Sequence, residues 1–347
     1  MYKNKRNNWC IVVILLGVVS QAFSYKAANL TDAVNYGGKL ESITLTGPQN
    51  KDQIELLNNM KFQRLTLIGE AVDDVLPLLN NINIECLELG RYPIEKIPLS
   101  VFSNINLKTI GIIDTNIQSI PKEIENLQKL EILFFKNSKL SEVPDNFDKL
   151  TNLMYVVLSS NNFDTFPWQV LKSSSLIDIG LDDNAISVIP DQIAMASNIV
   201  SMTLRDNKIQ SISPFIGLLE NLTSLTLSNN KLTTLPEELT LLKRLSTLKL
   251  SNNALEKLPD SIGKLSNLGR LDLSNNCLTN LPVSFADLQM LYTLYLAGNP
   301  LTIFPDLEKN SNLKRLYLDE NYPKDKIEVI RKQLPLCQIY INGVILK

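Results

Sequence analysis

The chain has 347 residues, of which 44% are hydrophobic, 20% charged and 7% aromatic. This composition excludes a disordered tail, a collagen-like fibre and a multi-span membrane protein. The formal net charge of −2 does not indicate a nucleic-acid partner, for which a basic stripe is expected. The chain contains no histidine, which excludes Ser-His-Asp and Cys-His catalysis and imidazole metal sites. We therefore expect a binding protein that has no cofactor and no metal.

Residues 1–24 have the pattern of a secretory signal peptide. Three basic residues precede the apolar run 11–19, and small residues lead to a cleavage point after Ser24. About ten apolar residues are too few to cross a bilayer, which needs about 20 in helical form. We therefore expect a secreted chain, extracellular or periplasmic, that begins at Tyr25 and has no membrane span.

A short segment repeats along the rest of the chain. LTSLTLSNNKLTTLP from Leu222, LSTLKLSNNALEKLP from Leu245 and LGRLDLSNNCLTNLP from Leu268 are each offset by 23 residues. The same frame extends back to Leu40 and forward to Leu313, which gives thirteen units over residues 40–321 at spacings of 22 or 23 residues. Self-similarity at such a period indicates a solenoid.

Each unit has the pattern of a short strand followed by a turn. Its first, fourth and sixth positions are apolar, and the last two alternate with polar residues as in a strand with one buried face. One unit cannot bury that face alone, so the units must stack. A proline that follows the fourteenth position in most units ends the pairing. We predict an α/β repeat solenoid, a horseshoe with a parallel sheet on the concave face and a mostly irregular or short helical convex side.

Asparagine occupies the ninth position of the last eight units. Its amide both donates and accepts hydrogen bonds, so a buried asparagine can satisfy backbone groups in the turn at about 1 kcal/mol per bond. The eight residues are Asn161, Asn184, Asn207, Asn230, Asn253, Asn276, Asn299 and Asn321. The first five units hold Pro48, Glu70, Tyr92, Thr115 and Ser138 instead. Because most of these cannot continue the pattern, we expect the first five units to open first.

Both ends of the array need a cover for their apolar faces. Residues 25–39, with a short helix over 30–34, are expected to cover the start. Residues 322–347 are expected to close the other end, with a helix over 324–332 that carries Ile327 and Ile330 at helical spacing, followed by a closing strand. Cys86, Cys277 and Cys337 are odd in number and far apart along the stack, so we predict no disulfide.

The pattern LxxLxLxxNxLxxLPxxIxxLxx is the one carried by leucine-rich repeat proteins. From Leu107 onward the chain closely resembles their 23-residue class. It is similar to the arrays of Ras-binding scaffolds and of secreted bacterial repeat proteins. The ends lack the clustered cysteines of many animal ectodomains, which favours the bacterial secreted class. The resemblance implies a horseshoe fold and a protein partner, without naming that partner.

Concave side chains are expected at the third, fifth and seventh positions of each unit, which point away from the core. In units four to six these positions are mostly apolar, and exposed apolar and aromatic residues mark interaction sites. The residues are Ile113, Ile132, Phe134, Lys136, Tyr155 and Val157. The alternative is that such residues simply suit strands.

An acidic rim beside this patch is expected to orient a basic partner. It consists of Asp178, Asp182, Asp183, Arg205 and Asp206, which could equally form a solvated charged turn. Gly111 and Gly180 are expected to leave room over the sheet. A second, weaker candidate is the pair Tyr295 and Tyr317 with Arg315.

The leading interpretation is a secreted or cell-surface protein-interaction module, monomeric and without chemistry of its own. The alternative is an intracellular scaffold of the kind that holds small GTPases, which requires that residues 1–24 are not a signal peptide. An enzyme is disfavoured because only about 26 residues follow Asn321 and Cys337 has no neighbouring base.

Overall fold

The computed structural model describes residues 25–26, 42–46, 57, 61–69, 83–91, 94–303 and 307–346. The expected signal peptide and the expected helix over 30–34 lie outside these residues. Of the expected N-terminal cover, only strand β1 (Tyr25–Lys26) is described, and it pairs in parallel with β2 (Ser42–Thr46). Within the described residues no helix combines the length and the apolar character needed to cross a membrane.

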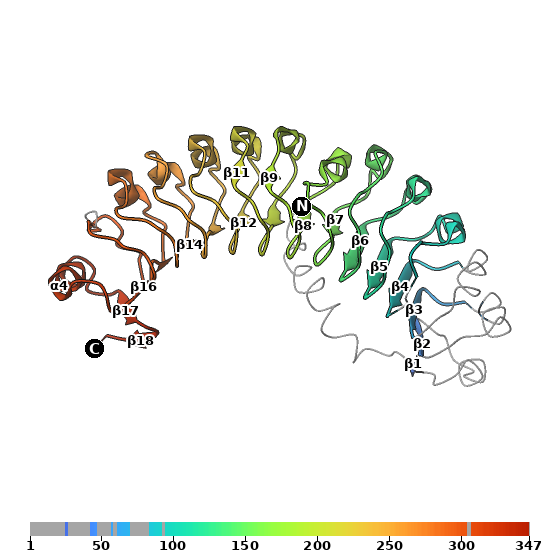
Figure 1. Cartoon of the computed structure of the whole chain (residues 1–347), viewed down its shortest axis with the longest axis horizontal. Coiled ribbons are helices and arrows are strands. Elements are labelled where there is room, and N and C mark those ends of the chain that lie inside the picture. The colour runs from blue at the N-terminus through green and yellow to red at the C-terminus, as the bar shows by residue number, and fades with distance from the viewer. Residues whose placement is uncertain are drawn as a thin grey trace, which may run out of the picture.

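One sheet of sixteen strands runs through the described residues in chain order. Its neighbouring strands are parallel except for the last two, which are antiparallel. Figure 1 shows an arc with the strands on its inner side and short helical turns on its outer side, which confirms the predicted solenoid and its concave parallel sheet. The strands after β2 are β3 (Arg64–Ile68), β4 (Cys86–Gly90), β5 (Thr109–Ile113), β6 (Ile132–Lys136), β7 (Tyr155–Val157), β8 (Asp178–Gly180), β10 (Ser201–Thr203), β12 (Ser224–Thr226), β13 (Thr247–Lys249), β14 (Arg270–Asp272), β15 (Thr293–Tyr295), β16 (Arg315–Leu318), β17 (Gln338–Ile341) and β18 (Val344–Ile345).

The apolar positions of the units form one continuous core. In β13 and the residue after it, Leu248 and Leu250 are fully buried, whereas Thr247 and Lys249, which alternate with them, are partly exposed. The same core cluster extends from Ile43 at one end to Ile339 at the other. Each large apolar side chain that is fully buried contributes about 1.5–3 kcal/mol, so stacking is what stabilises the individual units.

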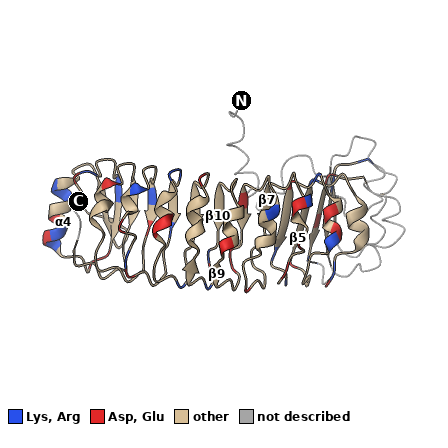
Figure 2. Ribbon diagram, turned by 90° about the horizontal axis from the view of Figure 1, so that it is seen from above, with Lys and Arg blue, Asp and Glu red and all other residues tan. Residues whose placement is uncertain are grey.

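Short 3-10 helices form the convex side. Pro121 and Pro236 precede two of them with extended backbone angles, so proline ends the inner segment and starts the outer one as predicted. Charged residues of both signs are scattered over this outer surface (Figure 2). The helices are η2 (Leu99–Ser103), η3 (Lys122–Asn126), η4 (Phe147–Lys149), η5 (Trp168–Lys172), η6 (Asp191–Met195), η7 (Pro214–Leu218), η8 (Glu237–Leu241), η9 (Ile262–Lys264) and η10 (Val283–Asp287), and β9 (Val188–Ile189) pairs with β11 (Ser211–Ile212) in a second, small sheet.

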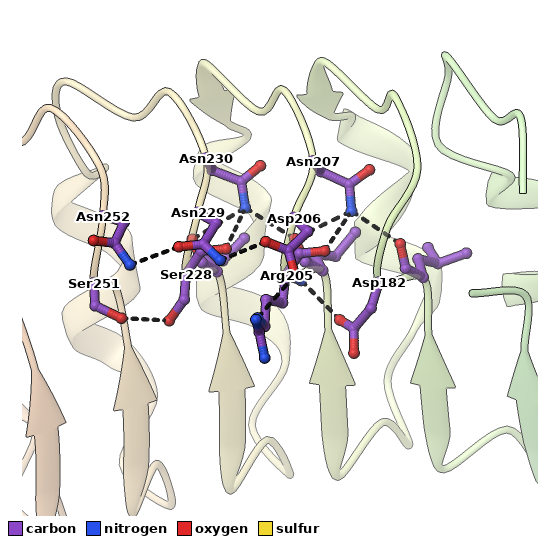
Figure 3. A network of polar contacts seen from close by, with 12 residues as sticks. Asp182, Arg205, Asp206, Asn207, Ser228, Asn229, Asn230, Ser251 and Asn252 are labelled. Carbon is purple, nitrogen blue, oxygen red and sulfur yellow. Dashed lines mark hydrogen bonds and ion pairs between the residues drawn. The ribbon is translucent and has the colours of Figure 1, made fainter. Parts of the chain in front are cut away.

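The ninth-position asparagines form a ladder that ties each turn to the units beside it. The Nδ2 of Asn207 donates to the carbonyl oxygens of Leu181 at 2.9 Å and of Leu204 at 3.2 Å. It also donates to the carbonyl of Arg205 at 3.2 Å, and its Oδ1 accepts from the N–H of Ile186 at 3.0 Å. Figure 3 shows several of these bonds. The equivalent ladder residues are Asn161, Asn184, Asn230, Asn253, Asn276 and Asn299.

Asn321 does not belong to this ladder, contrary to the prediction. Its side chain is exposed, and its backbone N–H donates to Oδ1 of Asp319 at 3.1 Å. A ladder asparagine bonds to the turn of the unit before it, as Asn207 does to Leu181. The carbonyls of its own unit accept from the ladder asparagine of the next unit, as Leu204 does from Asn230. After Asn321 the chain enters helix α4 (Lys324–Gln333) instead of another unit, so no further turn packs over it.

A second row of side-chain contacts, not predicted from the sequence, lies at the eighth position. The residues there have positive φ, for example +58° at Asn229 and +56° at Asn252, a region in which Asn and Asp are the most tolerated side chains. The Nδ2 of Asn252 donates to Oδ1 of Asn229 at 2.6 Å, and Asn229 in turn donates to Asp206 (Figure 3).

In units four and five a contact between two hydroxyl groups takes the place of the asparagine ladder. The hydroxyls of Thr115 and Ser138 are buried and lie 2.8 Å apart. Among the described residues the asparagine ladder begins in the next unit, where Oδ1 of Asn161 accepts the backbone N–H of Leu140 at 3.1 Å. A hydroxyl has fewer donors and acceptors than an amide, so fewer backbone groups are satisfied on this side.

We therefore expect the amides of β5 to exchange with solvent faster than those of β13. Hydrogen exchange measured by mass spectrometry or NMR checks this, because local opening free energies follow the number of bonds that must break. Equal or greater protection before residue 140 than after it would show that the ladder does not set the order of opening.

The C-terminal elements are a helix and strands, as expected. In α4, Ile327 is 6% and Ile330 2% exposed, so the face predicted from their spacing is the buried one. After this helix, β17 continues the sheet in parallel beside β16, and β18 turns back antiparallel.

Candidate functional site

Side chains from separate units form rows across the concave face. The parallel register aligns Ile132 with Tyr155 and Tyr155 with Asp178, and in the next row it aligns Phe134 with Val157. Neighbouring strands lie about 4.8 Å apart, so residues 23 positions apart in the chain become direct neighbours. The predicted patch and the predicted acidic rim are therefore adjacent.

The apolar patch is smaller than the sequence suggested. Ile113, Ile132, Tyr155 and Val157 are partly exposed, which leaves them available on the concave surface. Phe134 is only 5% exposed, so the expectation of an exposed aromatic anchor at this position is wrong. Lys136, at the end of the same strand, is exposed.

Neighbouring side chains occupy the space over the two glycines. A Cβ atom at Gly111 would lie 3.3 Å from Cγ of Glu88, and one at Gly180 would lie 3.4 Å from Cγ1 of Val157. Gly111 is also the register partner of Phe134. The expectation that these glycines leave open room is therefore wrong, because small and large residues alternate along the row and pack against each other.

Strand β8 and the residues after it carry two carboxylates on the concave side, Asp178 and Asp182, with Gly180 between them. Burial raises the pKa of Asp178 to about 7, and the negative charge of Asp182 adds to this shift. Burial also raises the pKa of Asp182, whose Oδ1 accepts the backbone N–H of Arg205 at 2.7 Å. The pair is thus desolvated more than it is neutralised.

The nearby cation, Arg205, forms its ion pair with Asp206 instead of with Asp178 or Asp182. Nε of Arg205 lies 2.9 Å from Oδ2 of Asp206, and both Arg205 and Asp183 are exposed. Among the described residues, the ion pairs within 4 Å do not include Asp178 or Asp182. Neither carboxylate has a described cation within ion-pair distance, and Asp178 is the register partner of Tyr155.

The raised pKa of Asp178 predicts a loss of stability with rising pH. The folded chain holds this proton more tightly than the unfolded chain, so the stabilisation is complete below about pH 4 and lost as pH rises through 7. We expect the free energy of unfolding of the wild type to fall by about 1–3 kcal/mol relative to Asp178→Asn between pH 4 and 8. Urea unfolding of both proteins across this range checks the sign, and parallel pH profiles would contradict it.

The second candidate is an aromatic stack near the C-terminal end. The rings of Tyr295 and Tyr317 are stacked with centroids 4.3 Å apart, and those of Tyr317 and Tyr340 with centroids 4.4 Å apart. Arg270 covers the free face of Tyr295 at 5.0 Å and donates from Nη2 to its hydroxyl at 3.1 Å. Tyr340 and Arg270 were not among the residues predicted from the sequence for this candidate. Continuing the unit frame into the closing strand would have aligned Tyr340 with the other two tyrosines.

The cysteines have no partner among themselves in the described part of the chain. Cys86 is buried, Cys277 exposed and Cys337 intermediate, and all three are free thiols. Burial raises the pKa of Cys86 to about 12, with Glu88 adding to the shift, so this thiol is not a nucleophile at neutral pH. Over the residues that the structure describes, no cluster of three or more Cys, Asp or Glu side chains is arranged to hold a metal ion.

The repeat pattern and the fold together identify the family. The sequence pattern described as "Leucine rich repeat" matches residues 197–255 and 243–301. The solved structures that share the fold include repeat proteins of the same kind. The chain is a leucine-rich repeat protein. No curated protein sequence matches this leucine-rich repeat protein.

Solved leucine-rich repeat structures from bacteria and plants resemble the chain. A leucine-rich repeat protein of Leptospira interrogans is 26% identical, with a TM-score of 0.54 over 92% of this chain and 100% of that one. An internalin of Listeria monocytogenes is 19% identical, with a TM-score of 0.69 over 90% and 88%. The ectodomain of the Arabidopsis thaliana receptor kinase GASSHO1/SCHENGEN3 is 24% identical, with a TM-score of 0.65 over 87% of this chain and 38% of that one. The last two likenesses concern the fold alone.

Proposed function

We propose that this leucine-rich repeat protein is a secreted or cell-surface module that binds a protein partner on its concave face and has no catalytic activity. The general role of a protein-interaction module follows from the fold. Two of the similar structures are complexes, the plant ectodomain with CASPARIAN STRIP INTEGRITY FACTOR 2 and the Drosophila Toll with Spatzle. Secretion rests on the expected signal peptide at residues 1–24.

The observation that carries the location of the site is the pair of desolvated carboxylates Asp178 and Asp182, of which Asp178 lies next to Tyr155 in the sheet. A lysine or arginine side chain of the partner would restore the charge balance of the two carboxylates, and the ring of Tyr155 offers its aliphatic part an apolar contact. Ile132 on the neighbouring strand β6 and Val157 on the same strand as Tyr155 extend that contact. Ile113, Lys136 and Arg205 lie at the edge of the proposed site. Phe134 is buried beneath the surface and supports it instead of anchoring the partner.

The test is affinity capture with the chain that starts at Tyr25, followed by a dissociation constant for the captured partner. We expect the double variant Tyr155→Ala/Asp178→Asn to weaken binding at least tenfold, since it removes an aromatic anchor and a charge. The matched control is Tyr292→Ala/Asp164→Asn, which makes the same two changes at exposed residues outside the concave rows. Equal affinities of the two double variants would refute this site.

The alternative function is an intracellular scaffold that binds a small GTPase. It differs from the proposal in where the protein resides. Fractionation of the native cells, with determination of the N-terminal residue, separates the two: a chain that starts at Tyr25 outside the cytoplasm supports secretion, and an intact N-terminus in the cytosol supports the scaffold.

A further inference from the structure

A second polar row lies on the concave face at its C-terminal end. The register places Thr293 on β15 directly between Arg270 on β14 and Arg315 on β16. Beside this row, in the next one, lie the stacked rings of Tyr295 and Tyr317. We call these five residues the arginine–tyrosine surface. It is separated from Asp178 by the four strand pairings that lead from β8 to β14, so the proposed binding site does not include it.

Two buried polar groups of this surface lack an acceptor or a donor. The side chain of Thr293 is 1% exposed, and its hydroxyl makes no hydrogen bond within the described residues. The same is true of Nε of Arg270. Buried polar groups are almost always hydrogen-bonded to protein or water, so these two neighbouring donors can each take an acceptor that arrives from outside.

The tyrosine stack holds one arginine in place. Arg270 is fixed over the face of Tyr295 and bonded to its hydroxyl, so the guanidinium is oriented before any partner arrives. Since the ring faces contact each other, the surface exposes ring edges and hydroxyls, and ring edges carry partial positive charge. Arg315 is exposed and free to approach from the other side of Thr293.

The nearby acids are occupied by other groups. Oδ1 of Asp272 accepts from the backbone N–H and the hydroxyl of Ser274 at 3.1 and 2.9 Å. Asp319 accepts the backbone N–H groups of Gly298 and Asn321. In the described part of the chain neither carboxylate forms an ion pair within 4 Å, and both repel a densely charged polyanion. An isolated carboxylate on a polypeptide fits this arrangement better than a sulfated polysaccharide does.

We propose that the arginine–tyrosine surface docks an acidic segment of a partner protein, with one Asp or Glu carboxylate between Arg270 and Arg315. Its oxygens accept hydrogen bonds from the hydroxyl of Thr293 and from both guanidiniums. Guanidinium–carboxylate hydrogen bonds are charge-assisted and directional, so this contact determines both the sign of the partner's charge and its position.

The test uses two labelled peptides, (Glu-Gly)5 and (Lys-Gly)5, in fluorescence anisotropy titrations with the whole chain at low salt. We expect the glutamate peptide to bind with an affinity that falls as salt is raised, and the lysine peptide not to bind at this surface. The variant Arg270→Gln/Arg315→Gln is expected to weaken the glutamate peptide at least tenfold. The control Lys208→Gln/Lys231→Gln removes two exposed charges outside both proposed sites and is expected to leave the affinity within twofold.

The variant Thr293→Val distinguishes a role of the Thr293 hydroxyl in binding from a role in folding. Because the hydroxyl has no partner in the free protein, we expect the melting temperature to stay unchanged or rise. The affinity for the glutamate peptide is nevertheless expected to fall severalfold. A purely structural Thr293 would give the opposite pair of results, a lower melting temperature and unchanged binding.

Three outcomes overturn the proposal. They are no binding of the glutamate peptide at millimolar concentration, equal loss of affinity in the arginine variant and its lysine control, and displacement by heparin at lower charge concentration than by polyglutamate. Tyr155→Ala/Asp178→Asn is expected to bind the glutamate peptide normally, so failure at this surface and failure at the proposed concave site are distinguishable.

Discussion

Replacing Asn207 by alanine is expected to destabilise the array by about 3 kcal/mol or more. The change removes the donor to three carbonyls and the acceptor of the Ile186 N–H, and a buried group left without a partner costs about 1–3 kcal/mol. Because Asn207 lies in the middle of the solenoid, the damaged turn affects the packing of both neighbouring units. Chemical unfolding monitored by circular dichroism measures the effect.

Asn321 provides the matched control for this prediction. It occupies the same ninth position of its unit, but it is exposed and makes none of the ladder bonds. Asn321→Ala is expected to change the free energy of unfolding by no more than about 0.5 kcal/mol. Similar losses in both variants would mean that the residue type matters at this position and the ladder does not.

Replacing Gly263 by alanine is expected to cost about 1–3 kcal/mol, the range for overpacking. A Cβ atom at this position in η9 would overlap the backbone oxygen of Ser284 and lie 2.9 Å from Cβ of Asp287. Backbone atoms cannot rotate away, so η9 and η10 must move apart. Thermal unfolding checks the size of the loss.

Gly90→Ala is the control and is expected to have the opposite sign. The nearest atom to a Cβ at Gly90 is Cγ1 of Ile68 at 3.8 Å, an ordinary contact. Alanine in a strand loses less conformational entropy on folding than glycine does, so a gain of about 0.5–1 kcal/mol is expected. A stabilised Gly263→Ala protein would show that the convex helices are not closely packed at this point.

The fold could be predicted because every unit repeats the same pattern of apolar and polar positions. Leu248 and Leu250 are apolar at positions that a strand turns inward, and the same positions recur in unit after unit, so errors at one unit are outweighed by the others. Helix α4 was predictable for a similar reason, since Ile327 and Ile330 share one helical face. The spacing of apolar residues within a short segment can be read from the sequence alone.

The concave surface was harder to predict because exposure depends on the residue in the next unit. Phe134 occupies an outward position, yet it is buried between Gly111 and Val157 on the neighbouring strands. The repeat pattern does not determine the sizes of these two neighbours. Tyr340 joins the tyrosine stack only because the closing strand keeps the register of β16. Such contacts follow from pairs of residues about 23 positions apart, which a pattern within one unit does not contain.

The concave face is proposed to bind a protein partner. Hydroxyl-radical footprinting of the chain with and without its captured partner is the decisive experiment, because it reports the solvent exposure of individual side chains. We predict that Tyr155 becomes protected in the complex, while the exposed convex residues Met195 and Phe215 keep their reactivity. Protection of Met195 and Phe215 with unchanged Tyr155 would contradict the claim.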